Sequence, residues 1–177
     1  MSQAREARSP ATTHPGLITE VIRDTLRRMP LATTYGDEQR DLQPAVKRAL
    51  EEALLRSFPT ISLQTTISVG GKGKPSLRLH GTSFWPDVDV SEGPIPLAAI
   101  EVKIIRPPQG ASTAIAEAIG QSIIYSVRYP HVFTFVVHYG RSDVRFHDED
   151  DTLTKRLALC NVELIVRGPG DAPPPSA

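Results

Sequence analysis

Apolar residues along the chain follow two spacings, one typical of helices and one typical of strands. Spacings of three and four predict helices over 17–29, 37–57, 112–128 and 150–159, the first two ending near Pro30 and Pro59. Alternating or continuous apolar runs predict strands at 61–69, 97–105, 132–137 and 162–166, and a return strand that begins at 77–80 and continues at 87–90. This order predicts a single α/β domain with a central mixed β-sheet flanked by helices.

The run 97–105 is apolar at every position except Glu101 and Lys103. Side chains on a strand alternate between its two faces, so these two residues share a face. Burying an acid and an ammonium there is costly unless both have partners. Asp87 and Asp89 share a face of the preceding extended segment, and we expect all three carboxylates to converge with the lysine.

Such a convergence suits phosphodiester hydrolysis. Carboxylate oxygens are hard ligands for Mg²⁺ or Mn²⁺. The ion polarises a phosphate and lowers the pKa of a bound water, and a nearby lysine stabilises charge in the transition state. An ordinary Glu–Lys ion pair beside an unrelated aspartate is the alternative, and spacing by itself leaves both open.

Pro86-Asp87 followed by Glu101-Val102-Lys103 resembles the signature of the PD-(D/E)xK nuclease superfamily. Two other segments extend the resemblance over residues 36–140. The pair Gln121 and Tyr125 is similar to the Gln-x-x-x-Tyr helix motif of RecB-like members, and 37–47 is similar to the family's first core helix.

The resemblance implies a restriction-endonuclease-like core and a metal-dependent nuclease acting on DNA, of restriction, repair or defence type. Asp87 and Glu101 would bind Mg²⁺ (or Mn²⁺) and Lys103 would assist the water. Gln121 and Tyr125 would hold the phosphate or the substrate strand. A catalytically silent module on the same fold, binding nucleic acid or protein, is the alternative function, because a fold alone does not establish activity.

An acid from the second helix would complete the metal shell. At 100° per residue, Glu38 lies about 40° from Leu42 in the apolar stripe, and Glu52 lies about 80° away on the same flank. Glu51 lies on the opposite side. This position, together with the resemblance to the family's first helix, favours Glu38 first and Glu52 second.

The chain has 20 Lys plus Arg and 20 Asp plus Glu, so its formal net charge is zero. A generally basic nucleic-acid coat is therefore excluded, and contact with DNA needs a local patch. The turn with Lys72 and Lys74 is one candidate for such a patch, although basic turns are more often simply solvated. The core is minimal, with no room for a large recognition domain, which favours a homodimer or a partner protein.

The single cysteine, Cys160, excludes an internal disulfide and a four-cysteine iron–sulfur cluster. Its apolar surroundings predict a buried site, and the lack of disulfides fits a cytoplasmic protein. No apolar run is long enough to span a membrane, and we expect no membrane partner. We expect unstructured segments at 1–15 and 168–177 and a nuclease-like domain at 16–167.

Overall fold

The computed structural model describes residues 15–59, 65–70, 77–106, 111–140, 148–169 and 171. They form one α/β domain with a five-stranded mixed sheet, in the order β1-β4-β5-β6-β7. The strands are β1 (Thr65–Val69), β2 (Leu77–Leu79), β3 (Thr82–Phe84), β4 (Val88–Glu92), β5 (Ile95–Ile105), β6 (His131–His138) and β7 (Val162–Arg167). The helices are α1 (Pro15–Arg28), the π-helical turn η1 (Glu38–Leu42), α2 (Gln43–Ser57), α3 (Ala111–Tyr125) and α4 (Asp148–Ala158).

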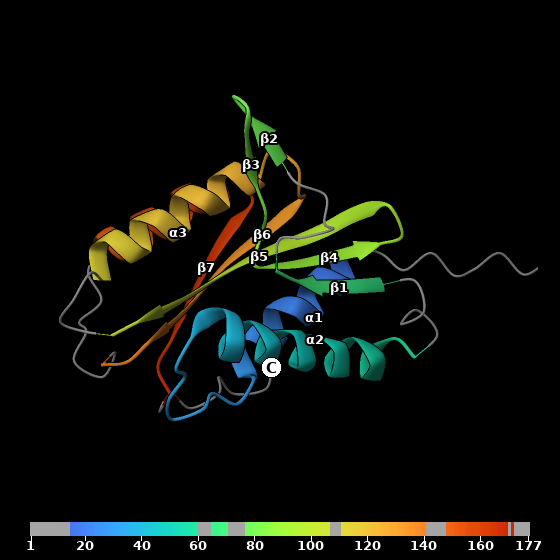
Figure 1. Cartoon of the computed structure of the whole chain (residues 1–177), viewed down its shortest axis with the longest axis horizontal. Helices are drawn as coiled ribbons and strands as arrows, with labels where there is room; N and C mark the ends of the chain where they lie inside the picture. The colour runs from blue at the N-terminus through green and yellow to red at the C-terminus, as the bar shows by residue number, and fades with distance from the viewer. Residues whose placement is uncertain are drawn as a thin grey trace, which may run out of the picture.

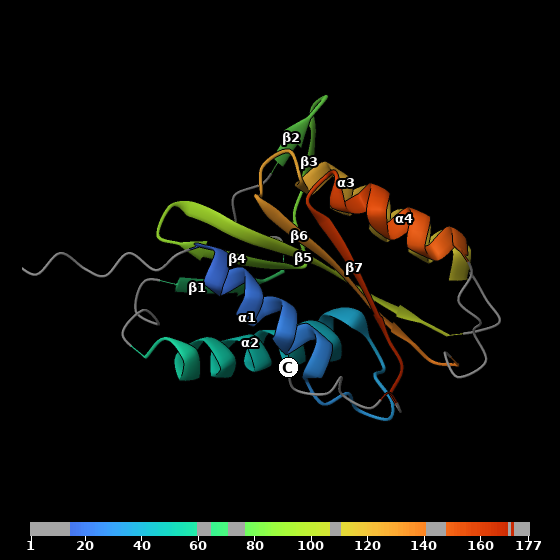
Figure 2. The same ribbon diagram turned by 180° about the vertical axis from the view of Figure 1, so that it is seen from behind.

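The sheet separates two layers of helices (Figure 1 and Figure 2). β1, β4 and β5 are joined antiparallel, whereas β5, β6 and β7 are parallel and connected through α3 and α4. On the α1–α2 side, Ile100, Val102 and Ile104 of β5 belong to the larger core. On the α3–α4 side, Ala99 packs in a smaller core with Tyr125 and Tyr129.

Residues 77–90 do not form the single interrupted strand that the sequence predicted. β2 pairs with β3 in a separate hairpin, and β4 starts anew at Val88. His80 and Gly81, with φ of 48° and 78°, form the tight turn between them. Positive φ at both central residues is the geometry of a two-residue hairpin turn, which reverses the chain where the sequence suggested only a break.

The second predicted helix, 37–57, is divided at its start. η1 forms wide turns in which the Gln43 N–H donates to the Glu38 carbonyl five residues back, and α2 begins only after it. Pro44 has no N–H and cannot make the next helical bond, which favours the irregular turn before it. The Asp37 side chain caps the turn by accepting from the N–H groups of Gln39 and Arg40.

The prediction for Cys160 is wrong, because its side chain is exposed. Leu157 is buried instead, and Cys160 lies in the turn after α4 that ends at Asn161, with φ of 56°. Most of both predicted unstructured termini, and the turn with Lys72 and Lys74, lie outside the described residues. Among the described helices, none has the length and apolar character needed to cross a bilayer.

Candidate active site

β5 extends beyond its antiparallel neighbour. Val88, the first residue of β4, pairs with Ile100, so the rest of β5 has no strand partner on that edge. On its other edge, β5 pairs with β6 as far as Ile105. The free edge therefore presents backbone N–H groups that need acceptors.

Two carboxylates take the place of the missing strand. Asp87 accepts a hydrogen bond from the Val102 N–H at 2.9 Å through Oδ2. Glu38, from η1, accepts from the Ile104 N–H at 2.8 Å through Oε1. Acids far apart in the sequence are thus fixed next to each other along one strand, on both sides of Lys103.

Gln43 holds the second oxygen of Asp87. Its Nε2 donates to Asp87 Oδ1 at 2.7 Å, and the Gln43 side chain is buried. Sequence reasoning did not single out this residue. Its signal was a polar amide at the start of an apolar helix stripe, and such an amide needs a buried partner.

Glu101 projects from β5 to the α3 side and is only 4% exposed. Burial, followed by the nearby charge of Asp87, raises the pKa of Glu101 to about 8. The negative charge of Glu38 raises this pKa further, while the ammonium of Lys103 and the hydroxyl of Tyr125 lower it. Glu101 therefore lies close to two other acids and one base, as the sequence predicted for Asp87 and Lys103.

Lys103 lies close to both Glu38 and Glu101. Its Nζ lies 3.5 Å from Glu38 Oε2, a long contact between partly exposed side chains. An ion pair of this length contributes little to stability. Lys103 is thus able to bind a ligand without losing a strong contact within the protein.

Tyr125 and Gln121 come from α3, which packs over β5 and β6 (Figure 1). The Tyr125 hydroxyl donates to the Trp85 carbonyl at 2.7 Å. Burial and the nearby charge of Glu101 raise the pKa of Tyr125. Gln121 lies one turn earlier and is half-buried. Tyr125 therefore connects the Glu101 carboxyl group to the segment just before Asp87.

Asp89 does not join the other acids, in contrast to the prediction. Its Oδ1 accepts from the Tyr129 hydroxyl at 2.7 Å, and its Oδ2 accepts from the Ser91 hydroxyl at 2.6 Å. These bonds satisfy both oxygens of a carboxylate that is 2% exposed. Asp89 is a structural acid of the smaller core.

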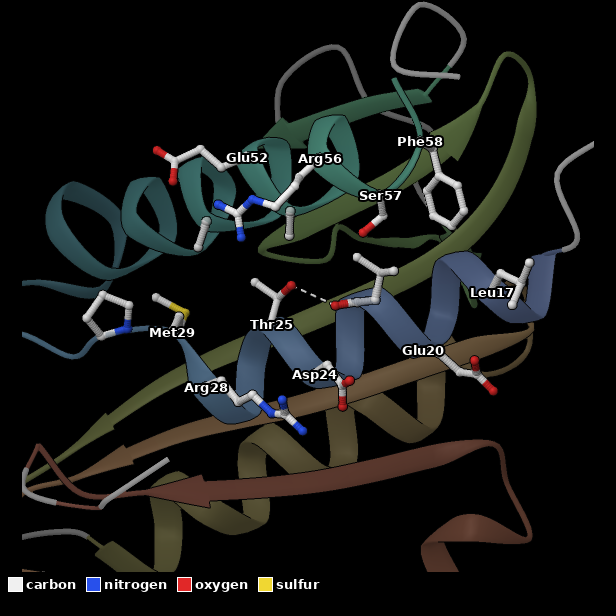
Figure 3. A pocket seen from close by; sticks show the side chains of 14 residues that line it. Leu17, Glu20, Asp24, Thr25, Arg28, Met29, Glu52, Arg56, Ser57 and Phe58 are labelled. Atoms are coloured by element: carbon white, nitrogen blue, oxygen red, sulfur yellow. Dashed lines mark hydrogen bonds between the residues drawn. The ribbon is translucent and has the colours of Figure 1, made fainter. Parts of the chain in front are cut away.

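Glu52 lies away from the free edge of β5. It lines a groove of about 500 Å³ between α1 and α2, together with Arg56, Arg28 and Asp24 (Figure 3). Glu38 makes contacts with β5, so of the two candidates only Glu38 is positioned beside Asp87 and Lys103.

A hollow of about 410 Å³ adjoins Glu38. Its lining residues come from the turn before η1, the start of η1, and the end of β5 with the residue after it: Gly36, Asp37, Glu38, Gln39, Ile104 and Arg106. The Arg106 guanidinium donates to the carbonyls of Tyr35 and Gly36 and lies over the Tyr139 ring, 5.6 Å from its centroid. Arg106, a second residue that sequence reasoning missed, thereby fastens the turn that carries Glu38 to β5.

The donor chemistry of this site fits a small divalent cation. No group of three or more His, Cys, Asp or Glu side chains within the described ranges is arranged to hold an ion by itself. Mg²⁺ does not require one, since it commonly binds one or two carboxylates and completes its shell with water and phosphate oxygens. Burial is the main cause of the raised pKa of Glu101, and the nearby charges of Asp87 and Glu38 add to it. A bound cation would offset the contribution of these charges.

Comparison of the chain with protein-family models, with curated proteins and with solved structures gives no match. Function is therefore inferred from the geometry of the site.

Proposed function

We propose that the protein is a metal-dependent nuclease that hydrolyses DNA phosphodiester bonds, with a restriction-endonuclease-like core of the PD-(D/E)xK type. The supporting observation is the free edge of β5, where Asp87 and Glu38 bind the backbone on both sides of Lys103 and the nearby Glu101 carries a strongly raised pKa. Structural acids are normally satisfied by hydrogen bonds from the protein, as Asp89 is here.

The chain's residues have separate roles in this proposal. Asp87 and Glu101 would hold Mg²⁺ or Mn²⁺, and Glu38 would complete the shell directly or through water. The ion, when bound, would polarise the phosphate and lower the pKa of a bound water. Lys103 would orient the attacking water and stabilise the negative charge that develops on the phosphate oxygens as the P–O bond to the leaving oxygen breaks.

Gln121 and Tyr125 would complete the substrate side of the site. Gln121 has both donors and an acceptor for a phosphate or a base. Tyr125 is buried and already donates to the Trp85 carbonyl, so its direct part is to position the segment that leads to Asp87. Of the two, Gln121 is therefore the better candidate for direct contact with DNA.

One observation favours a catalytically silent binding module on the same fold. Both oxygens of Asp87 and both oxygens of Glu38 already accept hydrogen bonds from the protein, the one from Lys103 to Glu38 being long. In that case the acids would only satisfy the N–H groups on the free edge of β5, and binding of a partner would not depend on a divalent ion.

A cleavage assay separates these two functions. Purified protein is incubated with supercoiled plasmid, linear duplex and single-stranded DNA in Mg²⁺, Mn²⁺ or EDTA. We expect Asp87→Asn to reduce cleavage on the order of a hundredfold or more, as the loss of a charged metal ligand would. Glu52→Gln changes an acid of α2 in the other groove and should cleave normally. Equal cleavage by wild type and Asp87→Asn would reject the assignment.

A further inference from the structure

The side of α3 that points away from the sheet is exposed and uncharged. Ala118, Ser122 and Tyr125 are buried against β5 and β6. The opposite side carries four exposed residues without charge, which we call the outer stripe: three in α3 and one in the turn 126–128 that continues it. These residues are Ala116, Gly120, Ile123 and Val127. The exposed Thr113 lies on the same side, nearer the start of α3.

A helix as apolar as α3 is normally buried between a sheet and other elements. In the described part of the chain it is covered on one side only, and α3 lies at the periphery of the molecule (Figure 1). Ile123 and Val127 remain 42% and 70% exposed. Continuous apolar surface on a helix with no charge to interrupt it is typical of an interface.

Gly120 has no evident purpose within the monomer. Glycine inside a helix destabilises it by roughly 1 kcal/mol relative to alanine. A Cβ placed at Gly120 would meet nothing within 4 Å among the described residues. Nothing described in the chain therefore requires glycine at this position. A second surface that approaches the helix backbone closely would require it.

The outer stripe is complementary to itself. Along the outer stripe, the two small residues come first and the two large residues follow, the last of them in the turn after α3. A two-fold axis that pairs two copies of α3 antiparallel places Ala116 opposite Val127 and Gly120 opposite Ile123. Each large side chain then meets a small one. The two-fold symmetry of a homodimer makes each of these contacts occur twice.

Charges beside the outer stripe follow the same symmetry. Glu117 and Arg128 are exposed on the same flank, near opposite ends of the outer stripe. A two-fold axis perpendicular to α3 leaves that flank on the same side in both copies. It therefore brings Glu117 of one copy towards Arg128 of the other, and opposite charges meet.

We propose that a second copy of this chain docks antiparallel on the outer stripe of α3, with Ile123 and Val127 of each copy over Gly120 and Ala116 of the other. The 15 residues of α3 span about 22 Å, and a helix is about 10 Å wide. The contact is thus well below the roughly 800 Å² per partner of a standard interface. The dimer forms reversibly and depends on protein concentration. It does not depend on nuclease activity, because no residue of the outer stripe contacts the carboxylates.

Sedimentation velocity of the full chain over a concentration series in EDTA tests the dimer. Wild type should shift from monomer to dimer as its concentration rises. Gly120→Leu should remain monomeric at every concentration, because the added side chain prevents close approach. The same substitution should raise the melting temperature, because leucine favours the helix more than glycine does. A merely structural glycine would not give opposite changes in association and stability.

Val127→Glu, a second variant at an exposed position, should also remain monomeric. The matched control is Leu55→Glu, at a 55% exposed residue of α2 on the other side of the sheet, and it should dimerise as wild type does. A wild type that is monomeric throughout would overturn the proposal. So would dimers that survive both α3 substitutions, or loss of the dimer in Leu55→Glu alone. A monomer whose outer stripe binds another protein or DNA instead would equally exclude the second copy as occupant.

Discussion

At the level of single residues, the carboxyl group of Glu101 combines burial with the nearby charges of Asp87 and Glu38. Each factor disfavours the ionised form, and Lys103 compensates only in part. Asp89 is equally buried, but it accepts two hydroxyl hydrogen bonds that stabilise a carboxylate. The two acids face the same side of the sheet with opposite environments, which is why we assign chemistry to one and structure to the other.

Glu101→Gln should stabilise the metal-free protein at alkaline pH. An unfolded glutamate releases its proton near pH 4.5, whereas the folded protein retains it up to about pH 8. The folded state binds this proton more tightly, so the free energy of unfolding of wild type falls as pH rises from 4.5 to about 8. Glutamine mimics the protonated acid and removes this contribution.

Thermal unfolding in EDTA between pH 5 and 9 measures the effect. The gain for Glu101→Gln should grow with pH and reach on the order of 2 to 4 kcal/mol above pH 8. Glu52→Gln, at an exposed acid, should follow wild type throughout. An unchanged or lowered stability of Glu101→Gln at pH 9 would show that the pKa of Glu101 is not raised in the folded protein.

At the level of elements, the site depends on where β4 begins and how η1 turns. β5 would be an ordinary interior strand if β4 began several residues before Val88, and its N–H groups would then bind a strand rather than Asp87 and Glu38. The wide turn of η1 before Pro44 directs Glu38 towards Ile104. Irregular helical turns of this kind are frequent at functional sites.

Pro44→Ala should impair the site without unfolding the protein. The restored N–H allows regular α-helical bonding before Gln43, which would rotate Glu38 away from the Ile104 N–H. We expect a melting temperature within a few degrees of wild type and a cleavage rate reduced about tenfold or more. Pro59→Ala, at the other end of α2, is the control. Wild-type cleavage by Pro44→Ala would mean that the proline does not set the position of Glu38.

The sequence predicted the elements that follow from periodicity and missed those that depend on distant partners. The apolar run of β5 and the shared face of Glu101 and Lys103 follow from alternation alone. The hydrogen bond from Tyr129 to Asp89 does not follow from alternation, because the hydroxyl comes from a residue 40 positions away. The effect of Pro44 was underestimated because proline near a helix start is usually tolerated.

At the level of the whole molecule, β5 is the strand at which the sheet changes from antiparallel to parallel. Its neighbour β4 belongs to the antiparallel part and begins only opposite Ile100, whereas β6 pairs with β5 as far as Ile105. Both helical layers reach this strand, η1 from one side and α3 from the other. The chain has no net charge, so the cluster at β5 is a local concentration of acid rather than part of a charged surface.

The most direct test of the nuclease proposal is the initial rate of DNA cleavage measured against Mn²⁺ concentration, for wild type and Glu101→Gln side by side. We predict saturable, EDTA-sensitive cleavage by wild type. At saturating metal, the variant should cleave at least about a hundredfold more slowly although it is folded. Cleavage that persists in EDTA, or equal rates for the two proteins at saturation, would contradict a metal-dependent site built around Asp87, Glu101 and Lys103.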